Sequence, residues 1–431
     1  MKEGDLQDGR AAATRGRRSG VRQAEAPARA AVRWTPPAVD SRADPALDAA
    51  LRRRIDALTK PRGALGRIES LMRQIGGLQG RVDPRLEAPQ ALVFAADHGL
   101  AAHGVSAYPS EVTAQMVANF VAGGAAISVR ARQHGLGLTV VDAGVRGAAL
   151  PACANRALGV AGAVGAAMAT DGAPARSVPP ALDAAAEGGA TPAARLVRRP
   201  VAPGTADAAE GPAMTPAECV AALELGRDCV RALPGNALVL GEMGIGNSSA
   251  AALLTARLTG APLAACVGRG TGLDDAGLAR KQAVLARIAA RHASSAEPLD
   301  ALAAFGGLEI AALVGALLQA AHERRLVVID GFIVTAALLV AHAVRPAVLD
   351  ACVFAHRSDE AGHALALAFL GARPLLALDL RLGEGSGAAL AWPIVASAVA
   401  LLAGMASFDT AGVSGPAAAA GLQGPAEAMP A

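Results

Sequence analysis

Short apolar segments alternate with longer Ala-rich segments through most of the chain. Uninterrupted apolar runs of this length are typical of buried strands, and strands separated by helices indicate a parallel sheet covered on both faces. The predicted strands are residues 91–96, 138–141, 237–240, 326–329, 348–354 and 375–378. The predicted helices include residues 112–133, 275–291, 308–324 and 361–370, and a helical pattern also covers residues 45–78.

Three segments depart from this pattern because Ala, Gly, Pro and Arg dominate them. Residues 1–40 and 416–431 are predicted to be disordered tails, and residues 147–195 a poorly ordered insert, since few branched apolar side chains are present to build a core. Deleting residues 150–192 should therefore leave turnover intact. The uncharged segment 387–408 is long enough to cross a membrane, but its Ala and Gly content favours a buried helix in a soluble protein.

Charge and composition argue against several kinds of partner. The first 33 residues carry +4 of a total net charge of +3, which leaves −1 on the rest of the chain. With aromatic residues at 2%, neither a basic face nor stacking rings indicate nucleic-acid binding. The five cysteines form no CxxC pair, which favours a reducing compartment. The first residues show no apolar core of a signal peptide, so we expect a cytoplasmic protein.

Polar, glycine-rich sequences follow nearly every predicted strand. Open α/β sheets bind ligands at the carboxyl ends of their strands, so this distribution is typical of an enzyme. Glycine is densest in residues 241–249, 268–272 and 383–387. Backbone N–H groups at such turns can close on an anion, and Arg269 and Lys281 nearby favour a phosphate or sugar phosphate. None of the loops matches a Walker loop or a dinucleotide fingerprint, and each alone could be a structural turn.

Two glutamates, Glu242 and Glu384, lie inside these glycine loops. Flanking glycines let a ligand approach closely, and partial desolvation raises the pKa of a carboxyl group toward that of a useful general base. The alternative is a carboxylate that accepts hydrogen bonds from its own loop. For either residue alone, both interpretations stay open.

A second set of residues has metal-ligand character. His356, Glu360 and His363 are spaced to share one helix face, with Asp97 and His98 as further candidates. The segment lacks an HExxH motif, and a helix start with packed histidines is the simpler interpretation. A metal-dependent hydrolase of a nucleotide or sugar phosphate is therefore the alternative function.

The segment after the first predicted strand carries side chains that could hold a flat, polar-edged heterocycle. They are Ser106, Tyr108, Gln115 and Met116. The serine could instead cap a helix and the methionine could belong to the core, so spacing alone does not decide between these roles.

Together these motifs resemble one family, the nicotinate-nucleotide–dimethylbenzimidazole phosphoribosyltransferases. The resembling segments occur in family order over roughly residues 45–415. They are residues 96–99, 104–109, 111–116, 201–205, 211–215, 241–247, 268–278, 330–332, 356–363 and 381–387. Ser248 and Ser249 depart from the family pattern, in which threonine is more usual.

The resemblance implies transfer of ribose 5-phosphate from nicotinate mononucleotide to 5,6-dimethylbenzimidazole, giving α-ribazole 5′-phosphate and nicotinate for cobalamin synthesis. Nicotinate leaves as a neutral ring that needs no acid, and one base suffices for the benzimidazole proton. Neither a metal nor a redox cofactor is required. The implied fold is α/β, with a doubly wound, Rossmann-like parallel sheet of about six strands. The implied assembly is a homodimer in which the small domain helps close the partner's site.

The resemblance also assigns roles to residues. Glu384 is expected to be the general base, with Glu242 as a second carboxylate near the ribose. The benzimidazole is expected against Ser106, Tyr108, Gln115 and Met116. The other expected binding residues are Gly244, Gly246, Asn247, Arg269, Gly270 and Lys281 for the phosphoribosyl group, and Ser358, Gly383 and Gly385. The implied domains are a helical part at 41–90, an α/β catalytic domain at 91–386 and a helical part at 387–415, the helical parts together forming the small domain.

Overall fold

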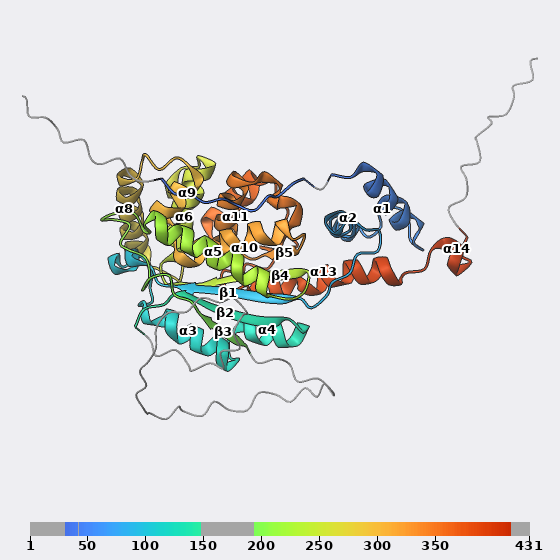
Figure 1. Ribbon diagram of the computed structural model, residues 1–431, viewed down its shortest axis with the longest axis horizontal. Helices are drawn as coiled ribbons and strands as arrows, with labels where there is room; N and C mark the ends of the chain where they lie inside the picture. Colours follow the sequence, from blue (N-terminus) through green and yellow to red (C-terminus); the bar gives the residue numbers. More distant parts are fainter. Residues whose placement is uncertain (1–30, 42, 148–193, 415–431) are drawn as a thin grey trace, which may run out of the picture. The chain divides into compact units, whose positions relative to one another are not determined.

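A parallel sheet of six strands, in the order β3-β2-β1-β4-β5-β6, forms the centre of the fold (Figure 1). The computed structural model describes residues 31–41, 43–147 and 194–414. The strands are β1 (Gln90–Ala96), β2 (Gly137–Gly144), β3 (Arg195–Arg198), β4 (Ala237–Met243), β5 (Leu326–Ile329) and β6 (Cys352–Phe354). The order runs outward in both directions from β1 and β4, which makes the sheet doubly wound and places a switch point between these two strands.

Helices cover both faces of the sheet (Figure 1). One face carries α5 (Pro216–Ala232), α10 (Leu308–His322) and α11 (Phe332–Val344), and the other carries α3 (Glu111–Ala122), α4 (Ala126–His134) and α13 (Ser386–Gly404). The remaining helices of the α/β part are α6 (Asn247–Thr259), α7 (Leu263–Cys266), α8 (Asp275–Arg291), α9 (Pro298–Phe305) and α12 (Ala361–Phe369). The predicted α/β architecture is confirmed.

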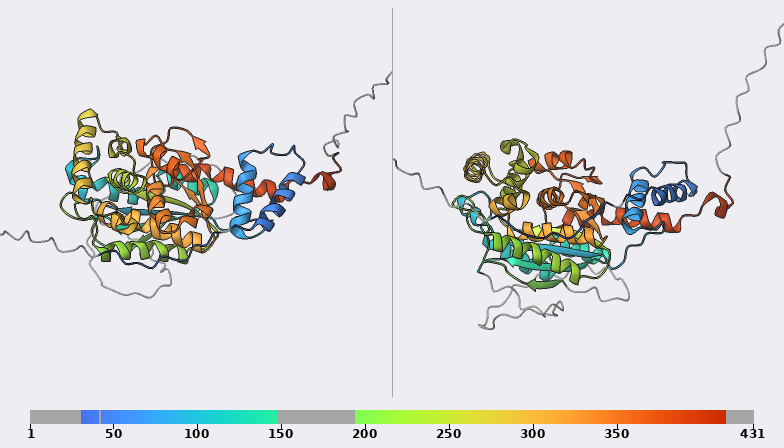
Figure 2. Two further views of the ribbon diagram at one scale, coloured as in Figure 1. Left: turned by 90° about the horizontal axis from the view of Figure 1, so that it is seen from above. Right: turned by 45° about the horizontal axis from the view of Figure 1, so that its top comes forward.

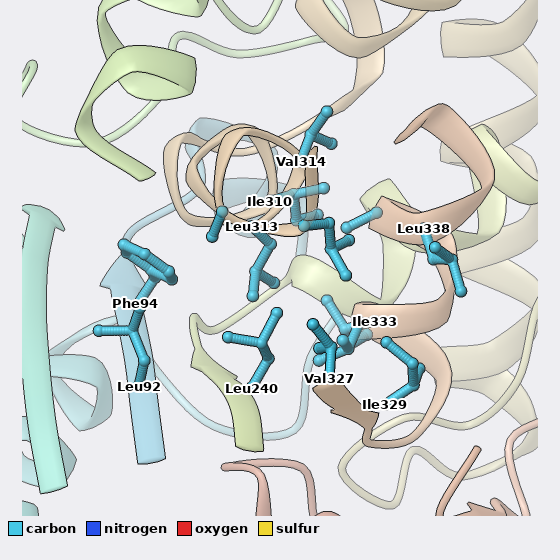
Figure 3. Close-up of a cluster of buried hydrophobic side chains, with 14 of the residues drawn as sticks. Leu92, Phe94, Leu240, Ile310, Leu313, Val314, Val327, Ile329, Ile333 and Leu338 are labelled. Atoms are coloured by element: carbon cyan, nitrogen blue, oxygen red, sulfur yellow. The ribbon is translucent and has the colours of Figure 1, made fainter. Parts of the chain in front are cut away.

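The main core lies between the central strands and helices α10 and α11 (Figure 3). Phe94 of β1, Leu240 of β4 and Val327 of β5 meet Ile310 and Leu313 of α10, and all five side chains are fully buried. Because the strands are covered on both faces, their sequences are continuously apolar rather than alternating. This arrangement explains why the strands were predictable from apolar runs.

Helices from the two ends of the described chain pack together (Figure 2). Helices α1 (Pro45–Ala57) and α2 (Arg67–Gln79) lie beside α13, which is followed by the short α14 (Phe408–Ala411). An antiparallel bridge joins Leu58 to Ser407, and the Thr59 N–H donates to the carbonyl of Ala406 at 3.0 Å. Helices from the segments 41–90 and 387–415 therefore pack against each other, and their division from the α/β part as a small domain stays a prediction.

Two stretches, residues 111–134 and Ser386–Gly404, are long and apolar enough to cross a membrane by length and composition alone. Core helices of soluble proteins pass the same test. In α13 the side chains of Ala391, Trp392 and Val395 are buried against the fold. The prediction of a packed Ala-rich helix over this segment is confirmed.

Several predicted element boundaries are wrong. The helix expected over 112–133 is divided into α3 and α4, because Gly123 adopts a left-handed φ of 84° and ends α3. Half of the strand expected over 348–354 is the 3₁₀ helix η2 (Pro346–Ala351). The strand expected over 375–378 is β8 (Leu376–Ala377), which pairs with β7 (His356–Arg357) in a separate sheet.

The sixth strand of the main sheet is β3, which lies at the edge of the predicted insert. Its sequence, Arg-Leu-Val-Arg, is short and charged at both ends, as suits an edge strand that pairs with β2. The rest of that insert, residues 148–193, and the segments 1–30 and 415–431 lie outside the described residues.

Residues 31–41 have no regular secondary structure, yet they are tied to the fold. The Val32 N–H donates to Asp300 at 2.8 Å, and the indole N–H of Trp34 donates to Glu224 at 2.7 Å. His322 Nδ1 lies 2.8 Å from the carbonyl oxygen of Ala38. The end of the predicted disordered tail is therefore a packed, extended segment.

Candidate active site

A cavity of about 390 Å³ lies at the carboxyl ends of β4 and β5, next to the switch point of the sheet. Side chains and loops that follow β1, β4, β5 and β7 line it together. The lining includes Ser106, Tyr108, Val112, Met116, Glu242, Gly244, Gly246, Asn247, Ser248, Gly270, Thr271, Asp330, Phe332, His356, Ser358, Glu360, Arg381, Leu382, Gly383 and Glu384. Most of the predicted site residues therefore converge on one space.

Glu242 stands at the end of β4 and is 5% exposed. The side-chain amide of Asn247 donates a hydrogen bond to its carboxyl group. The pKa of Glu242 is raised to about 8, mainly by burial and then by the negative charges of Asp330 and Glu309. The hydrogen bond from Asn247 lowers the pKa, but by less than each of these effects raises it. In the ligand-free protein this carboxyl group is therefore largely protonated at neutral pH.

Glu384 occupies a strained loop beside β4. Its φ of 66° is in the left-handed region, between Gly383 at 85° and Gly385 at 81°. The loop packs so closely on the strand that a Cβ at Gly241 would overlap the carbonyl oxygen of Glu384. Glycine at 241 is therefore required for the loop to reach the strand.

The carboxyl group of Glu384 is also perturbed. Burial raises its pKa to about 7, against the opposing effect of a hydrogen bond from the backbone N–H of Ile127. Its Oε2 atom is buried and has no hydrogen-bond partner among the described residues. A carboxylate that titrates near neutral pH and has a free acceptor oxygen is suited to take a proton.

Lys281 joins the glycine loops at the predicted phosphate site. It is fully buried, and its ammonium group donates to the Ser248 hydroxyl at 2.9 Å and to the Gly268 carbonyl at 3.1 Å. Burial lowers its pKa to about 8. Lys281 lies behind the described lining of the cavity, close to Gly270, where it can reach an anion bound between the loops.

The arginine at the cavity is Arg381 rather than Arg269. Arg269 donates to the carboxylate of Asp275 and to the Leu273 carbonyl, and it is not among the described lining residues. Arg381 lines the cavity, and its Nη1 lies 3.3 Å from the Gly270 carbonyl oxygen. Sequence reasoning did not single out Arg381, although it lies in the last resembling motif.

Three of the four residues expected around the benzimidazole line the cavity. Ser106, Tyr108 and Met116 do so, whereas Gln115 is exposed on α3 and lies outside the described lining. The Ser106 hydroxyl is 3.0 Å from that of Thr271, which links the loop after β1 to the 268–272 loop. Ser358 and Gly383 also line the cavity, but Gly385 does not.

The candidate metal ligands do not come together. Over the described ranges, no group of three His, Cys, Asp or Glu side chains is placed to hold a metal ion. His98 pairs with Glu309 at 2.6 Å in the interior, and His363 bonds to Thr335 and to the Ser358 N–H. Burial lowers the pKa of His363 to about 3. His98 and His363 are thus buried and hydrogen-bonded within the fold, whereas His356 lines the cavity, and the hydrolase alternative is not supported.

Asp330 opens the resembling segment 330–332, but no role was predicted for it from the sequence. It follows β5 directly, is 2% exposed and lines the cavity together with Glu242 and Glu384. Its position after a buried strand was the signal that could have marked it, because carboxyl ends of neighbouring strands share one edge of the sheet.

A doubly wound sheet with glycine loops, a buried lysine and two acids of raised pKa at its switch point defines an α/β enzyme for phosphorylated small molecules. A family model described as Phosphoribosyltransferase matches residues 41–413. The chain belongs to the nicotinate-nucleotide–dimethylbenzimidazole phosphoribosyltransferase family.

Individual relatives agree with this assignment. The chain is 58% identical over 380 residues to the nicotinate-nucleotide–dimethylbenzimidazole phosphoribosyltransferase of Variovorax paradoxus, covering 88% of this chain and 97% of the relative. It is 53% identical over 374 residues to that of Ralstonia nicotianae, covering 86% and 95%. The crystal structure of CobT from Thermus thermophilus superposes with a TM-score of 0.73 at 42% identity, covering 86% of this chain and 99% of CobT.

Proposed function

We propose that the protein transfers the 5-phosphoribosyl group of nicotinate mononucleotide to 5,6-dimethylbenzimidazole, giving α-ribazole 5′-phosphate and nicotinate for the cobalamin nucleotide loop. The observation that carries the proposal is the pair Glu242 and Glu384, buried, of raised pKa and lining one cavity with the glycine loops. The family assignment points to the same substrates.

The reaction needs one bond to break and one to form at the anomeric carbon. The bond to the nicotinate nitrogen breaks, and its electron pair stays on the ring, so the pyridinium leaves as a neutral pyridine. One benzimidazole nitrogen attacks the opposite face, which inverts the configuration, and the other nitrogen gives up its proton. A single base completes the balance without a redox cofactor.

Glu384 is the proposed base. A carboxylate accepts a proton best when its pKa lies near the working pH, and burial brings the pKa of Glu384 to about 7. Its unpartnered Oε2 can accept the benzimidazole N–H. The left-handed backbone fixes the direction of this side chain before the substrate arrives.

Glu242 is proposed to stabilise positive charge on the ribose. Its pKa of about 8, raised mainly by burial, keeps it largely neutral at neutral pH. A pyridinium cation in the cavity favours the ionised form, because opposite charge lowers the pKa of a carboxyl group. Binding of the donor would therefore convert Glu242 into the carboxylate that the transition state needs.

The 5′-phosphate is proposed to bind among Gly244, Gly246 and Gly270, where backbone N–H groups at the start of α6 favour an anion. Lys281 and Arg381 supply the positive charge. Asn247, Ser358 and Gly383 are proposed to border the ribose; Gly385 supports the loop from behind. The roles of Arg269 and Gln115 stay sequence predictions.

The acceptor ring is proposed to lie against Ser106, Tyr108 and Met116. Tyr108 is 54% exposed and Leu382 is 59% exposed, so apolar side chains flank the cavity mouth. This exposure supports a homodimer in which the small domain of one subunit covers the other's site. We also propose a cytoplasmic enzyme that binds neither nucleic acid nor membrane.

The test is a chromatographic assay of the purified protein with nicotinate mononucleotide and 5,6-dimethylbenzimidazole, with no metal added. The proposal expects a new nucleotide peak and an equimolar release of nicotinate. Nicotinate without a nucleotide product would indicate a hydrolase. No release from the folded protein would contradict the proposed donor or acceptor.

A further inference from the structure

We propose that Asp330 is the positioning residue for Glu384. Its carboxyl group accepts hydrogen bonds from the strained loop that holds Glu384 and from the first turn of α13. This inference rests on the proposed function, in which Glu384 is the base. In this proposal Asp330 acts only through Glu384 and does not itself contact the substrates.

Each carboxyl oxygen of Asp330 accepts a hydrogen bond from a backbone N–H that follows Glu384 in the chain. Oδ2 accepts from the Gly385 N–H at 3.2 Å, and Oδ1 accepts from the Ala388 N–H at 2.9 Å. These N–H groups belong to the N-cap and first turn of α13, where Gly385 offers no side chain to cap the helix. Asp330 supplies that cap from another element, β5, so it ties the loop to the sheet.

The loop needs such an anchor because its conformation is unfavourable on its own. Glu384 has a φ of 66°, and a residue with a Cβ holds that conformation only where its surroundings impose it. Gly241 touches the loop from β4, and Asp330 holds it from β5. Without the Asp330 contacts, the side chain of residue 384 would lose its fixed direction.

The charges around Asp330 make its role measurable. His356 Nδ1 lies 3.9 Å from Oδ1, and this histidine faces His363, whose ring centroid is 6.2 Å away. The nearby acids are Glu242 and Glu384, and the negative charge of Asp330 raises the pKa of both. Removing that charge should therefore lower the pKa of the base.

The experiment compares Asp330→Asn with Asp142→Asn in the full chain, using nicotinate mononucleotide and 5,6-dimethylbenzimidazole. Asparagine has nearly the same size as aspartate, but its side-chain NH₂ replaces one of the two accepting oxygens. That NH₂ would face the backbone N–H of Gly385 or Ala388, so one of the two hydrogen bonds is lost. Asp142 is a matched control, since it lies near the carboxyl end of β2, is 2% exposed, accepts from the Val145 N–H at 2.9 Å and is not among the described residues that line the cavity.

For Asp330→Asn we expect kcat to fall about 10- to 100-fold, the range that a small misplacement of a catalytic group costs. The KM for nicotinate mononucleotide should change less than about threefold. The acid limb of the kcat/KM profile should move to lower pH, because the negative charge that helps to raise the pKa of Glu384 is gone. Asp142→Asn should keep kcat within about threefold and leave the limb in place.

Wild-type kcat and an unmoved limb in Asp330→Asn would overturn the inference, as would equal losses in both variants. A wild-type protein that forms no product would instead contradict the proposed function. In that case, faster hydrogen exchange of residues 383–388 in Asp330→Asn than in Asp142→Asn would still support the anchor, and equal exchange would overturn it. Should Asp330→Asn not fold, Asp330→Glu is measured: reduced kcat with the limb unmoved supports the inference, and wild-type kcat overturns it.

Discussion

Two groups of buried acids lie at the carboxyl edge of the same sheet, and they have different surroundings. At the ends of β1 and β2, Asp97 accepts from the Arg146 N–H at 2.7 Å and Asp142 from the Val145 N–H at 2.9 Å. Neither acid is among the described residues that line the cavity, so we call these two acids the closed group.

Three other acids line the cavity at the carboxyl ends of β4 and β5, and we call them the open group. Glu242, Asp330 and Glu384 are all buried and line the cavity, and the negative charge of Asp330 raises the pKa of both glutamates. Burial alone therefore does not mark a reacting group, since both sets are buried. A raised pKa does not mark one either, since burial also raises the pKa of Asp142. The distinguishing feature is that the carboxyl groups at β4 and β5 face space for a ligand.

The largest expected effect separates the two groups by function. Glu384→Gln keeps the shape of the side chain but cannot accept a proton, so kcat should fall about 10²–10⁴-fold while the protein stays folded. Asp97→Asn, in the closed group, should keep kcat within about threefold. Turnover assays and circular dichroism of both variants provide the measurement. Near wild-type kcat in Glu384→Gln would place the base elsewhere, with Glu242 as the first suspect.

A smaller effect is expected from crowding the loop that holds Glu384. In Gly241→Ala the new methyl group would overlap the Glu384 carbonyl, so we expect a loss of about 1–3 kcal/mol in the free energy of unfolding. The displaced base should also lower kcat at least about tenfold. Gly77→Ala is the control, because a Cβ at that helical glycine has nothing within 4 Å; it should stabilise the protein by about 0.5–1 kcal/mol. Equal stability and activity in the two variants would refute the close packing.

The open group should also make stability depend on pH. The pKa values of about 8 for Glu242 and about 7 for Glu384 exceed the ordinary value of 4.5. Between about pH 5 and 8 the folded protein holds protons that the unfolded chain has released, so the free energy of unfolding should fall as pH rises. Glu242→Gln removes part of this cost and should raise the free energy of unfolding at pH 8 by about 1 kcal/mol, which is about 1–2 °C in Tm for a chain of this length.

The control for that measurement is Glu210→Gln on the exposed surface, which should leave the pH dependence of Tm as in the wild type. Thermal unfolding followed by circular dichroism at pH 5, 6, 7 and 8 gives the slopes. If Glu242→Gln has the wild-type slope, Glu242 does not hold a proton in the folded protein.

The smallest effect concerns the low-complexity segment between β2 and β3. From the sequence alone, complete deletion of 150–192 is expected to leave turnover intact. In the structure this deletion would leave only five residues after Gly144 and two before Arg195. Adjacent parallel strands need a connection of about a dozen residues, so this deletion should unfold the edge of the sheet. Replacing 150–192 by a Gly/Ser linker of about twelve residues should keep kcat within about threefold. A loss above tenfold in the linker variant, with normal folding, would show that the segment contributes to catalysis.

The sequence predicted what its apolar runs and glycine loops specify locally. The parallel sheet followed from continuous apolar strands, and Glu242 and Glu384 were found because glycines flank them. The edge strand β3 was missed because two of its four residues are arginines. A strand that pairs on one side does not need a continuous apolar sequence.

Other features of the site depend on tertiary contacts. Arg381 lines the cavity, whereas Arg269 is bound to Asp275, and sequence spacing does not distinguish the two arginines. Sequence spacing placed Asp97 and His98 among possible metal ligands, but the fold encloses them behind the Gly244 loop. Which side chains face the cavity depends on how the helices and strands pack together, and a local sequence pattern does not predict it.

The most direct test is the pH dependence of kcat/KM for the wild type and Glu384→Gln, which reports the ionisation of the free enzyme. We predict two acid ionisations in the wild type, one near pH 7 from Glu384 and one near pH 8 from Glu242, and only the second in the low residual activity of the variant. An identical limb in both proteins would contradict the assignment of Glu384 as the base.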